Sequence, residues 1–214
     1  GFAVIVLTKF LFELPRPPDT LRQISKTSYG FPSGHVTGAT AFYGGLAIYS
    51  RWLNKHRRWI LSIFAVTIIA FSRLVLGVHY FVDLLGGVVF GGISLILVHF
   101  LTNYDLRLGF LFAFTVALLS GYFAGLAQDS LLAIGGTFGV LLGQIISDFL
   151  GFQWASPSPV LAVAGFGICS SFLGGAYFLS NPTIVLLFSM IAGLGAVSIP
   201  YIESQIPSYS GPIH

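Results

Sequence analysis

The chain has 214 residues, of which 55% are hydrophobic and 8% are charged, and its mean hydropathy is +0.88. Soluble domains carry roughly a quarter charged residues, so this composition excludes a soluble globular protein and indicates one that is embedded in a bilayer. The net charge of +3 comes from cations dispersed among apolar runs, all of them between Lys9 and Arg107. Without a basic face or stripe, the chain is not expected to bind nucleic acid. Cys169 is the single cysteine, so neither a disulfide framework nor a cysteine metal cluster is expected.

Apolar runs separated by short polar breaks predict an all-α fold, a polytopic bundle of transmembrane helices. A spanning helix needs about 20 mostly apolar residues, and unpaired backbone amides in hydrocarbon are costly. We expect a partial span that ends near Glu13, followed by seven spans at residues 35–51, 59–76, 81–101, 108–126, 131–150, 158–179 and 183–200. The opening run is too short to cross a bilayer alone, so we expect the first helix to be clipped upstream of Gly1.

Glycines recur in these runs at spacings that favour helix packing. Gly87 and Gly91 form one pair spaced by four residues, and Gly139 and Gly143 form another. Small residues at this spacing let helix backbones approach closely, so we expect tight helix contacts at both pairs.

Residues 14–34, LPRPPDTLRQISKTSYGFPSG, interrupt the apolar pattern. Four prolines and several polar residues exclude a membrane helix there. Loops longer than about 12–15 residues are often lids or binding loops. The sequence therefore predicts a functional loop before the span at 35–51.

Six ionisable residues lie close to the apolar runs of the first hundred residues. Such residues are costly near a membrane span and by default indicate function. Because successive helices alternate in direction, we expect all six on one face of the membrane. Three cations would repel one another unless an anion lay between them, and Lys and Arg donors match phosphate oxygens. The predicted phosphate site contains Lys9, Arg16, His35, Arg73, His79 and Asp83.

The stretch FPSGH predicts a second contact for the same anion. Ser33 is a good N-cap residue, and the first amides of the helix that begins there carry a partial positive charge. A phosphate oxygen could rest on the Gly34 N–H and on the Ser33 hydroxyl.

His79 and Asp83 are four residues apart, which places them on one face of a helix that begins near residue 79. Asp83 could then hold one ring nitrogen of His79 and leave the other free as a nucleophile. His35, from a different helix, could protonate the leaving oxygen. Two histidines in opposite roles need environments that push their pKa values apart from the shared unperturbed value of about 6.5.

Three segments match, in order, the signature of the type 2 phosphatidate phosphatase superfamily. They are KFLFELPRP, PSGH and SRLVLGVHYFVD, against the pattern K-x6-RP, PSGH and SR-x5-H-x3-D, with no departure at a fixed position. The chain therefore resembles this family over residues 1–101, which we expect to be the catalytic core. Residues 102–214 are expected to add further transmembrane helices without a motif of their own.

The resemblance implies a metal-independent phosphatase, without a cofactor, that hydrolyses a lipid phosphate or diphosphate. It implies that His79 attacks phosphorus and forms a phosphohistidine, that His35 is the general acid, and that Asp83 orients His79. It assigns the binding of the phosphoryl oxygens to Lys9, Arg16, Ser33, Gly34 and Arg73. Within the family's substrates, an undecaprenyl-type diphosphate is preferred for a bacterial source.

Two alternatives stay open. The same intermediate would serve a phosphotransferase that passes the phosphoryl group to another lipid or to a sugar. The fold could also be kept in a lipid transporter or an anion-binding scaffold without turnover, although the intact set of His35, His79 and Asp83 argues against this.

We expect the chain to be an integral protein of the cell membrane, and the distribution of its basic residues predicts its orientation there. The loop RWLNKHRR at 51–58 holds four basic residues, and Arg107 falls on the same face, whereas Arg22 and Lys26 fall on the face of the predicted site. The positive-inside rule therefore predicts that residues 51–58 are cytoplasmic and that the site is extracytoplasmic.

Overall fold

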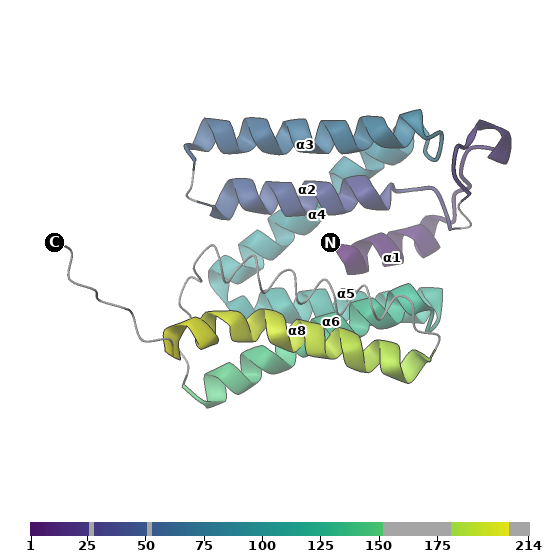
Figure 1. Cartoon of the computed structure of the whole chain (residues 1–214). Helices are drawn as coiled ribbons and strands as arrows, with labels where there is room; N and C mark the ends of the chain where they lie inside the picture. The colour runs from purple at the N-terminus through teal and green to yellow at the C-terminus, as the bar shows by residue number, and fades with distance from the viewer. Residues whose placement is uncertain (26–27, 51–52, 152–180, 206–214) are drawn as a thin grey trace. The chain divides into compact units, whose positions relative to one another are not determined.

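The computed structural model describes residues 1–25, 28–50, 53–151 and 181–205, and within these ranges the regular structure is helical. One 3-10 turn, Asp19–Leu21, lies in the long loop, and the described ranges contain no strand. The prediction of an all-α membrane fold is confirmed. The α-helices, shown in Figure 1, are α1 (Phe2–Phe12), α2 (Gly34–Tyr49), α3 (Lys55–Val75), α4 (Phe81–Tyr104), α5 (Leu106–Ala124), α6 (Gln128–Phe149) and α8 (Pro182–Gln205).

Every apolar run predicted within the described ranges is a helix. Four of these helices, α3 to α6, are long and apolar enough to cross a membrane. Helix α2 has only 16 residues, against the roughly 20 that a full span needs, so its crossing of the bilayer stays a prediction. The span predicted at 158–179 lies outside the described residues.

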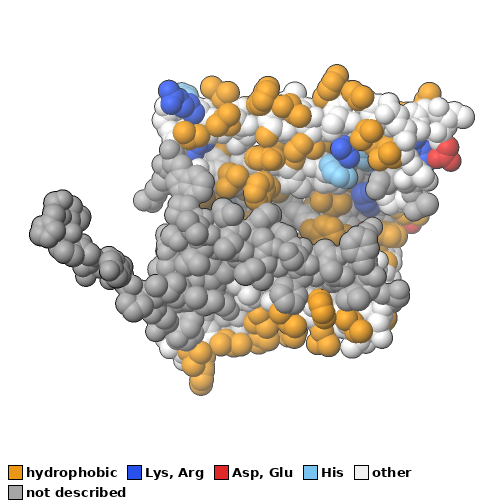
Figure 2. All heavy atoms as spheres, viewed as in Figure 1, with side chains coloured by type: hydrophobic (Ala, Val, Ile, Leu, Met, Phe, Trp, Pro, Cys, Tyr) orange, Lys and Arg blue, Asp and Glu red, His pale blue; other side chains and the backbone are white. Residues whose placement is uncertain are grey.

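Large apolar side chains cover the outer faces of the helices. Phe71, Ile96 and Phe100 are each about two thirds exposed, at 66%, 67% and 70%. Figure 2 shows hydrophobic side chains spread over the described part of the visible face, with basic side chains in two separate places at its left and right. Apolar surface of this extent is typical of a protein that contacts lipid.

The chain divides into two compact units, Gly1–Gly125 and Leu126–His214. In the first unit, α2 packs against α3 and α4, and α5 packs against α1 and α4. In the second unit, α6 packs against α8. Helix α5 therefore belongs to the first unit, while the boundary of the catalytic core at residue 101 stays a prediction.

Helices α2 and α4 approach each other closely at the predicted glycine pair. A Cβ atom on Gly87 would lie 2.8 Å from the Cβ of Val36, and one on Gly91 would lie 2.6 Å from the carbonyl oxygen of Thr37. Both separations are shorter than van der Waals contact, so a side chain at either position would force the helices apart. The predicted close packing at this pair is confirmed, and it holds the start of α2 beside the first turns of α4.

The second unit uses glycine in the same way. A Cβ atom on Gly135 would lie 2.6 Å from the carbonyl oxygen of Leu186, and one on Gly139 would lie 3.0 Å from the backbone nitrogen of Leu194. The predicted packing at Gly139 is therefore confirmed as a contact with α8. Gly143, its predicted companion, is buried in α6.

The long loop is anchored on the turn between α3 and α4. The backbone N–H of Gln23 donates to the Leu76 carbonyl over 3.1 Å, and its side chain Nε2 donates to the Val75 carbonyl over 3.0 Å. Gly77 adopts a φ of +65°, and the carbonyl of Leu21 fills the space that a side chain would need. The loop is thereby fixed two residues before His79.

Candidate active site

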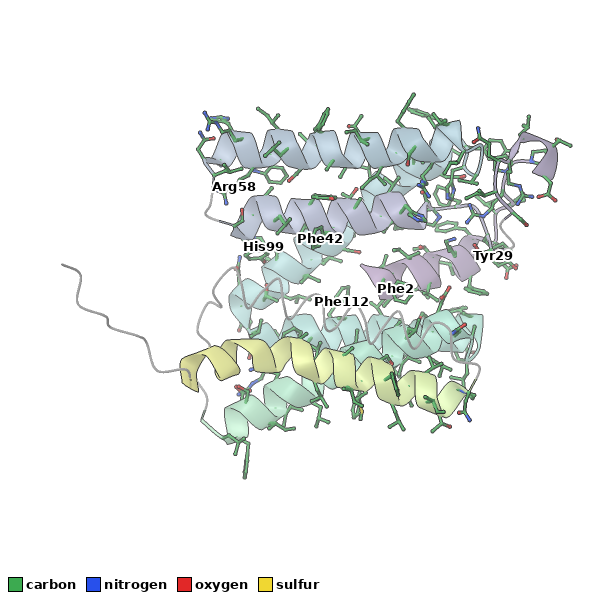
Figure 3. The ribbon with its side chains drawn as sticks, viewed as in Figure 1. Phe2, Tyr29, Phe42, Arg58, His99 and Phe112 are labelled. Carbon is green, nitrogen blue, oxygen red and sulfur yellow. The ribbon has the colours of Figure 1, made fainter. Side chains whose placement is uncertain are left out.

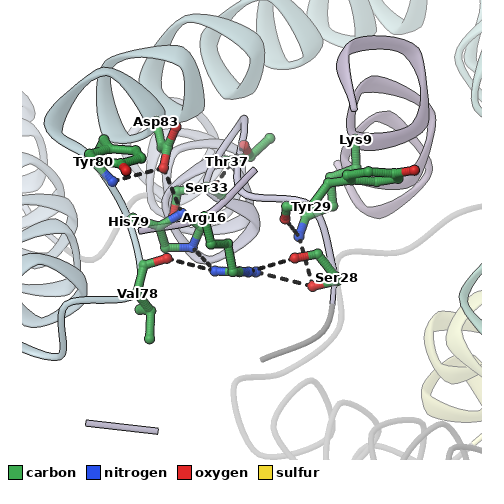
Figure 4. A network of polar contacts seen from close by, with 10 residues as sticks. All are labelled: Lys9, Arg16, Ser28, Tyr29, Ser33, Thr37, Val78, His79, Tyr80 and Asp83. Carbon is green, nitrogen blue, oxygen red and sulfur yellow. Dashed lines mark hydrogen bonds and ion pairs between the residues drawn. The ribbon is translucent and has the colours of Figure 1, made fainter. Parts of the chain in front are cut away.

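Four segments meet at one end of the first unit: the end of α1, the long loop, the start of α2 and the turn from α3 to α4 (Figure 1). Figure 4 shows side chains from all four segments in one network of polar contacts. Five of the predicted residues belong to this network, namely Lys9, Arg16, Ser33, His79 and Asp83. The structure therefore brings together residues that are up to 74 positions apart, counted from Lys9 to Asp83.

His79 and Asp83 form a buried pair at the start of α4. The Nδ1 atom of His79 lies 3.2 Å from Oδ2 of Asp83, and the two side chains are only 2% and 3% exposed. The same Oδ2 accepts the backbone N–H of Tyr80 over 2.8 Å. The first amides of a helix have no partner within it, and an acidic side chain at the third position can reach back to one of them. One carboxylate thus fixes both the helix start and the imidazole.

The other ring nitrogen of His79 faces Arg16. Nη1 of Arg16 lies 3.0 Å from Nε2 of His79 and donates to the Val78 carbonyl over 2.8 Å. Because an arginine only donates, Nε2 is the acceptor and the ring proton is on Nδ1, toward Asp83. Burial lowers the pKa of His79; the hydrogen bond to Asp83 opposes this shift, and the charge of Arg16 adds to it. The ring is therefore held neutral, with the lone pair of Nε2 directed at a cation.

Arg16 and Lys9 meet at Ser28, a loop residue outside every predicted motif. Arg16 donates from Nε to the Ser28 carbonyl over 2.7 Å and from Nη2 to the Ser28 Oγ over 3.1 Å. Lys9 donates from Nζ to the Tyr29 carbonyl over 2.9 Å and to the Ser28 Oγ over 3.4 Å. Sequence reasoning missed Ser28 and Tyr29 because a serine and a carbonyl in a polar loop carry no signal of their own.

Ser33 is the N-cap residue of α2, as predicted, but its hydroxyl makes no capping bond. Its backbone N–H donates to the Asp83 carbonyl over 2.9 Å, while its buried Oγ has no hydrogen-bond partner among the described residues. Buried hydroxyls normally have a partner, so this one can accommodate a ligand oxygen. A Cβ atom on Gly34 would lie 3.7 Å from Cε of Lys9, which shows that the start of α2 adjoins that cation.

Three predicted residues, Gly34, His35 and Arg73, are outside the network drawn in Figure 4. His35 is exposed in the first turn of α2. Arg73 is in the last turn of α3, where its Nε donates to the Ser72 Oγ over 3.1 Å. Its carbonyl accepts the backbone N–H of Val78 over 3.3 Å, so the backbone of Arg73 supports the residue before His79.

Comparison with known proteins places this site in a family. The model of the PAP2 superfamily matches residues 1–107, which contain all eight predicted site residues. Phosphatidylglycerophosphatase B of Bacillus subtilis (strain 168) is 34% identical over 80 residues, which cover 35% of this chain and 39% of that protein. The chain thus spans well under half of that relative's length, and no solved structure matches it. Because the family match covers half of the sequence, the chain belongs to the PAP2 superfamily.

Proposed function

We propose that the chain is a membrane phosphatase that removes phosphate from a lipid and uses His79 as its nucleophile. The observation that carries this proposal is the orientation of the buried His79 ring, with Nδ1 at Asp83 and Nε2 at Arg16. A guanidinium next to a nucleophilic nitrogen can bind the oxygens of the phosphoryl group that this nitrogen attacks. The family match and the similarity to a phosphatidylglycerophosphatase support the same reaction class.

The proposed reaction has two steps. Arg16 first releases Nε2 of His79 and donates to a phosphoryl oxygen instead. Nε2 then forms a bond to phosphorus while the bond from phosphorus to the leaving oxygen breaks, and that oxygen takes a proton from His35. Asp83 stabilises the positive charge of the phosphorylated imidazole. Water, deprotonated by His35, then releases phosphate and restores His79. Phosphoryl transfer depends mainly on positioning and charge stabilisation.

Donors for the phosphoryl oxygens come from three segments. The proposed cradle consists of the Lys9 ammonium, the Arg16 guanidinium, the Ser33 hydroxyl and the amide of Gly34. Arg16 is already next to Nε2, and the Ser33 Oγ is buried without a described partner. Arg73, whose side chain bonds to Ser72, would have to turn toward the phosphate to take part.

The surroundings of the cradle favour a lipid over a soluble substrate. Phe12, Leu14 and Phe81 lie beside the network in sequence and are 42%, 46% and 64% exposed. These apolar side chains can contact a hydrocarbon tail while the phosphate reaches the cations. A phospholipid phosphate is the first candidate because of the relative's activity, and an undecaprenyl-type diphosphate is the second.

The proposed site and the basic start of α3 are at opposite ends of the first unit. Lys55, Arg57 and Arg58 begin α3, whereas the turn that carries His79 follows its end. Figure 3 shows Arg58 and His99 toward one end of this unit and Tyr29 toward the other. The positive-inside rule favours an extracytoplasmic site, and this side of the membrane stays a prediction.

The proposal predicts phosphate release that does not need a divalent metal. Purified protein in detergent should hydrolyse phosphatidylglycerol phosphate, phosphatidate or undecaprenyl diphosphate equally well with and without excess chelator, because the cations of the cradle stabilise the transferring group. Released phosphate and lipid products would both be measured. Activity that vanished in chelator and returned with Mg²⁺ would contradict the mechanism. If the phosphoryl group were transferred to an added lipid acceptor and little free phosphate were released, the result would instead support a phosphotransferase.

Acidification is expected to inactivate the enzyme through His79. The nucleophile must be neutral, and burial lowers the pKa of His79 below its usual value of about 6.5. Activity is therefore retained above this lowered pKa and lost as the pH falls through it. The measurement is kcat/KM against pH, which reports the groups of the free enzyme. An acid limb with its midpoint above about 6.5 would be incompatible with this environment of His79.

A further inference from the structure

Ser28 joins the two cations of the proposed cradle. Its Oγ lies 3.1 Å from Nη2 of Arg16 and 3.4 Å from Nζ of Lys9. Figure 4 shows it between these two side chains, which come from the loop and from α1. Ser28 is on the opposite side of the guanidinium from His79, since Arg16 contacts the imidazole through Nη1.

The hydrogen-bond roles at Ser28 follow from the chemistry of its neighbours. Lys and Arg side chains have donors and no acceptor, so the Ser28 oxygen accepts from both. A hydroxyl has two lone pairs and one hydrogen, which means that this hydrogen is left to donate elsewhere. The described residues provide no acceptor for it. The guanidinium of Arg16 has five N–H groups, and four of them make described contacts: the one on Nε, both on Nη1 and one on Nη2. The second N–H of Nη2 makes none of these contacts.

We propose that Ser28 binds the phosphate of the substrate: its hydroxyl donates to a phosphoryl oxygen held between Lys9 and Arg16. An anion is the acceptor that two cations and an O–H donor recognise together. This inference rests on the proposed function and adds to the cradle a residue that lies outside the family signature.

The contacts of Ser28 allow this role to be separated from folding. Arg16 is also held by the Ser28 carbonyl through Nε and by the Val78 carbonyl through Nη1. Lys9 is also held by the Tyr29 carbonyl. Replacing the Ser28 hydroxyl therefore removes one donor from the cradle while the backbone contacts of both cations remain.

The test compares Ser28→Ala with Ser28→Thr, which keeps the hydroxyl, and with Ser25→Ala, an exposed serine of the same loop. We expect Ser28→Ala to raise KM for the lipid phosphate and the inhibition constant of inorganic phosphate about tenfold each, as for one hydrogen bond to a charged group. The value of kcat should change little, because the carbonyls of residue 28 and Val78 still hold Arg16 beside His79. Ser28→Thr and Ser25→Ala should behave like the wild type.

Unchanged KM and phosphate inhibition in Ser28→Ala, or an equal rise in Ser25→Ala, would overturn the inference. If Ser28→Ala does not fold, Ser28→Cys replaces it, because a thiol has a similar size and is a weak donor. A binding readout separates this inference from the proposed function: inorganic phosphate should raise the Tm of the wild type more than that of the variant. A wild type that binds phosphate but hydrolyses no lipid phosphate would contradict the proposed function alone.

Discussion

Replacing His79 with Asn is expected to lower phosphate release by at least about 1,000-fold, the scale of losses when a nucleophile is removed. The Asn amide can take the place of Nδ1 and donate to Asp83, so the buried carboxylate keeps a partner. The nitrogen that faces Arg16 is lost, and no other group on this side chain can attack phosphorus. Initial rates on a lipid phosphate in detergent would measure the effect.

His56→Ala is the control for this variant. His56 is exposed in the first turn of α3, at the opposite end of that helix from the site. It should retain wild-type rates, and both variants should keep the wild-type elution volume and helical circular dichroism. A folded His79→Asn protein with wild-type turnover would remove His79 from its proposed role.

Replacing Asp83 with Asn is expected to lower kcat by about 100-fold to 10,000-fold, by analogy with the loss of the charged partner of a catalytic histidine. The carboxylate accepts both the His79 Nδ1–H and the Tyr80 N–H on one oxygen. An amide at this position lacks the negative charge that stabilises a cationic imidazole. It can also donate to Nδ1, which would move the ring proton to Nε2, against the Arg16 donor.

Asp105→Asn is a matched control for this charge removal. Asp105 is the N-cap residue of α5, where its side chain accepts the Arg107 N–H over 2.8 Å, and asparagine caps helices equally well. Its kcat should equal that of the wild type. If Asp83→Asn lost activity only in proportion to a loss of folded protein, the carboxylate would be structural rather than part of the proposed mechanism.

The helices could be predicted from the sequence because a chain in hydrocarbon must satisfy its backbone internally. The end of the first helix near Glu13, the start of α2 after Ser33 and the close packing at Gly87 and Gly91 all agree with the structure. The contact between His79 and Asp83 was predicted from a spacing of four residues on one helix face. The contact is present, but α4 begins at Phe81, so His79 precedes the helix and Asp83 reaches back across the N-cap residue to it.

Contacts made by the long loop could not be predicted in this way. The bonds from Lys9 and Arg16 to Ser28 depend on the path of the loop across the end of the unit, which no residue spacing encodes. The docking of Leu21 at Gly77 is of the same kind. Arg73 was predicted to bind the phosphate, yet its guanidinium donates to Ser72, because a flexible side chain at a helix end can bond to an acceptor on the neighbouring residue.

In the proposed mechanism, the cradle presents phosphorus to Nε2 of His79. The most direct measurement uses a lipid with a labelled phosphate. Its turnover is quenched with alkali, and the labelled residue is then located by peptide mapping. An acid-labile, alkali-stable phosphoryl group is expected on the peptide that contains His79, and it should be absent in His79→Asn. Label on a different residue, or label retained in His79→Asn, would contradict this mechanism.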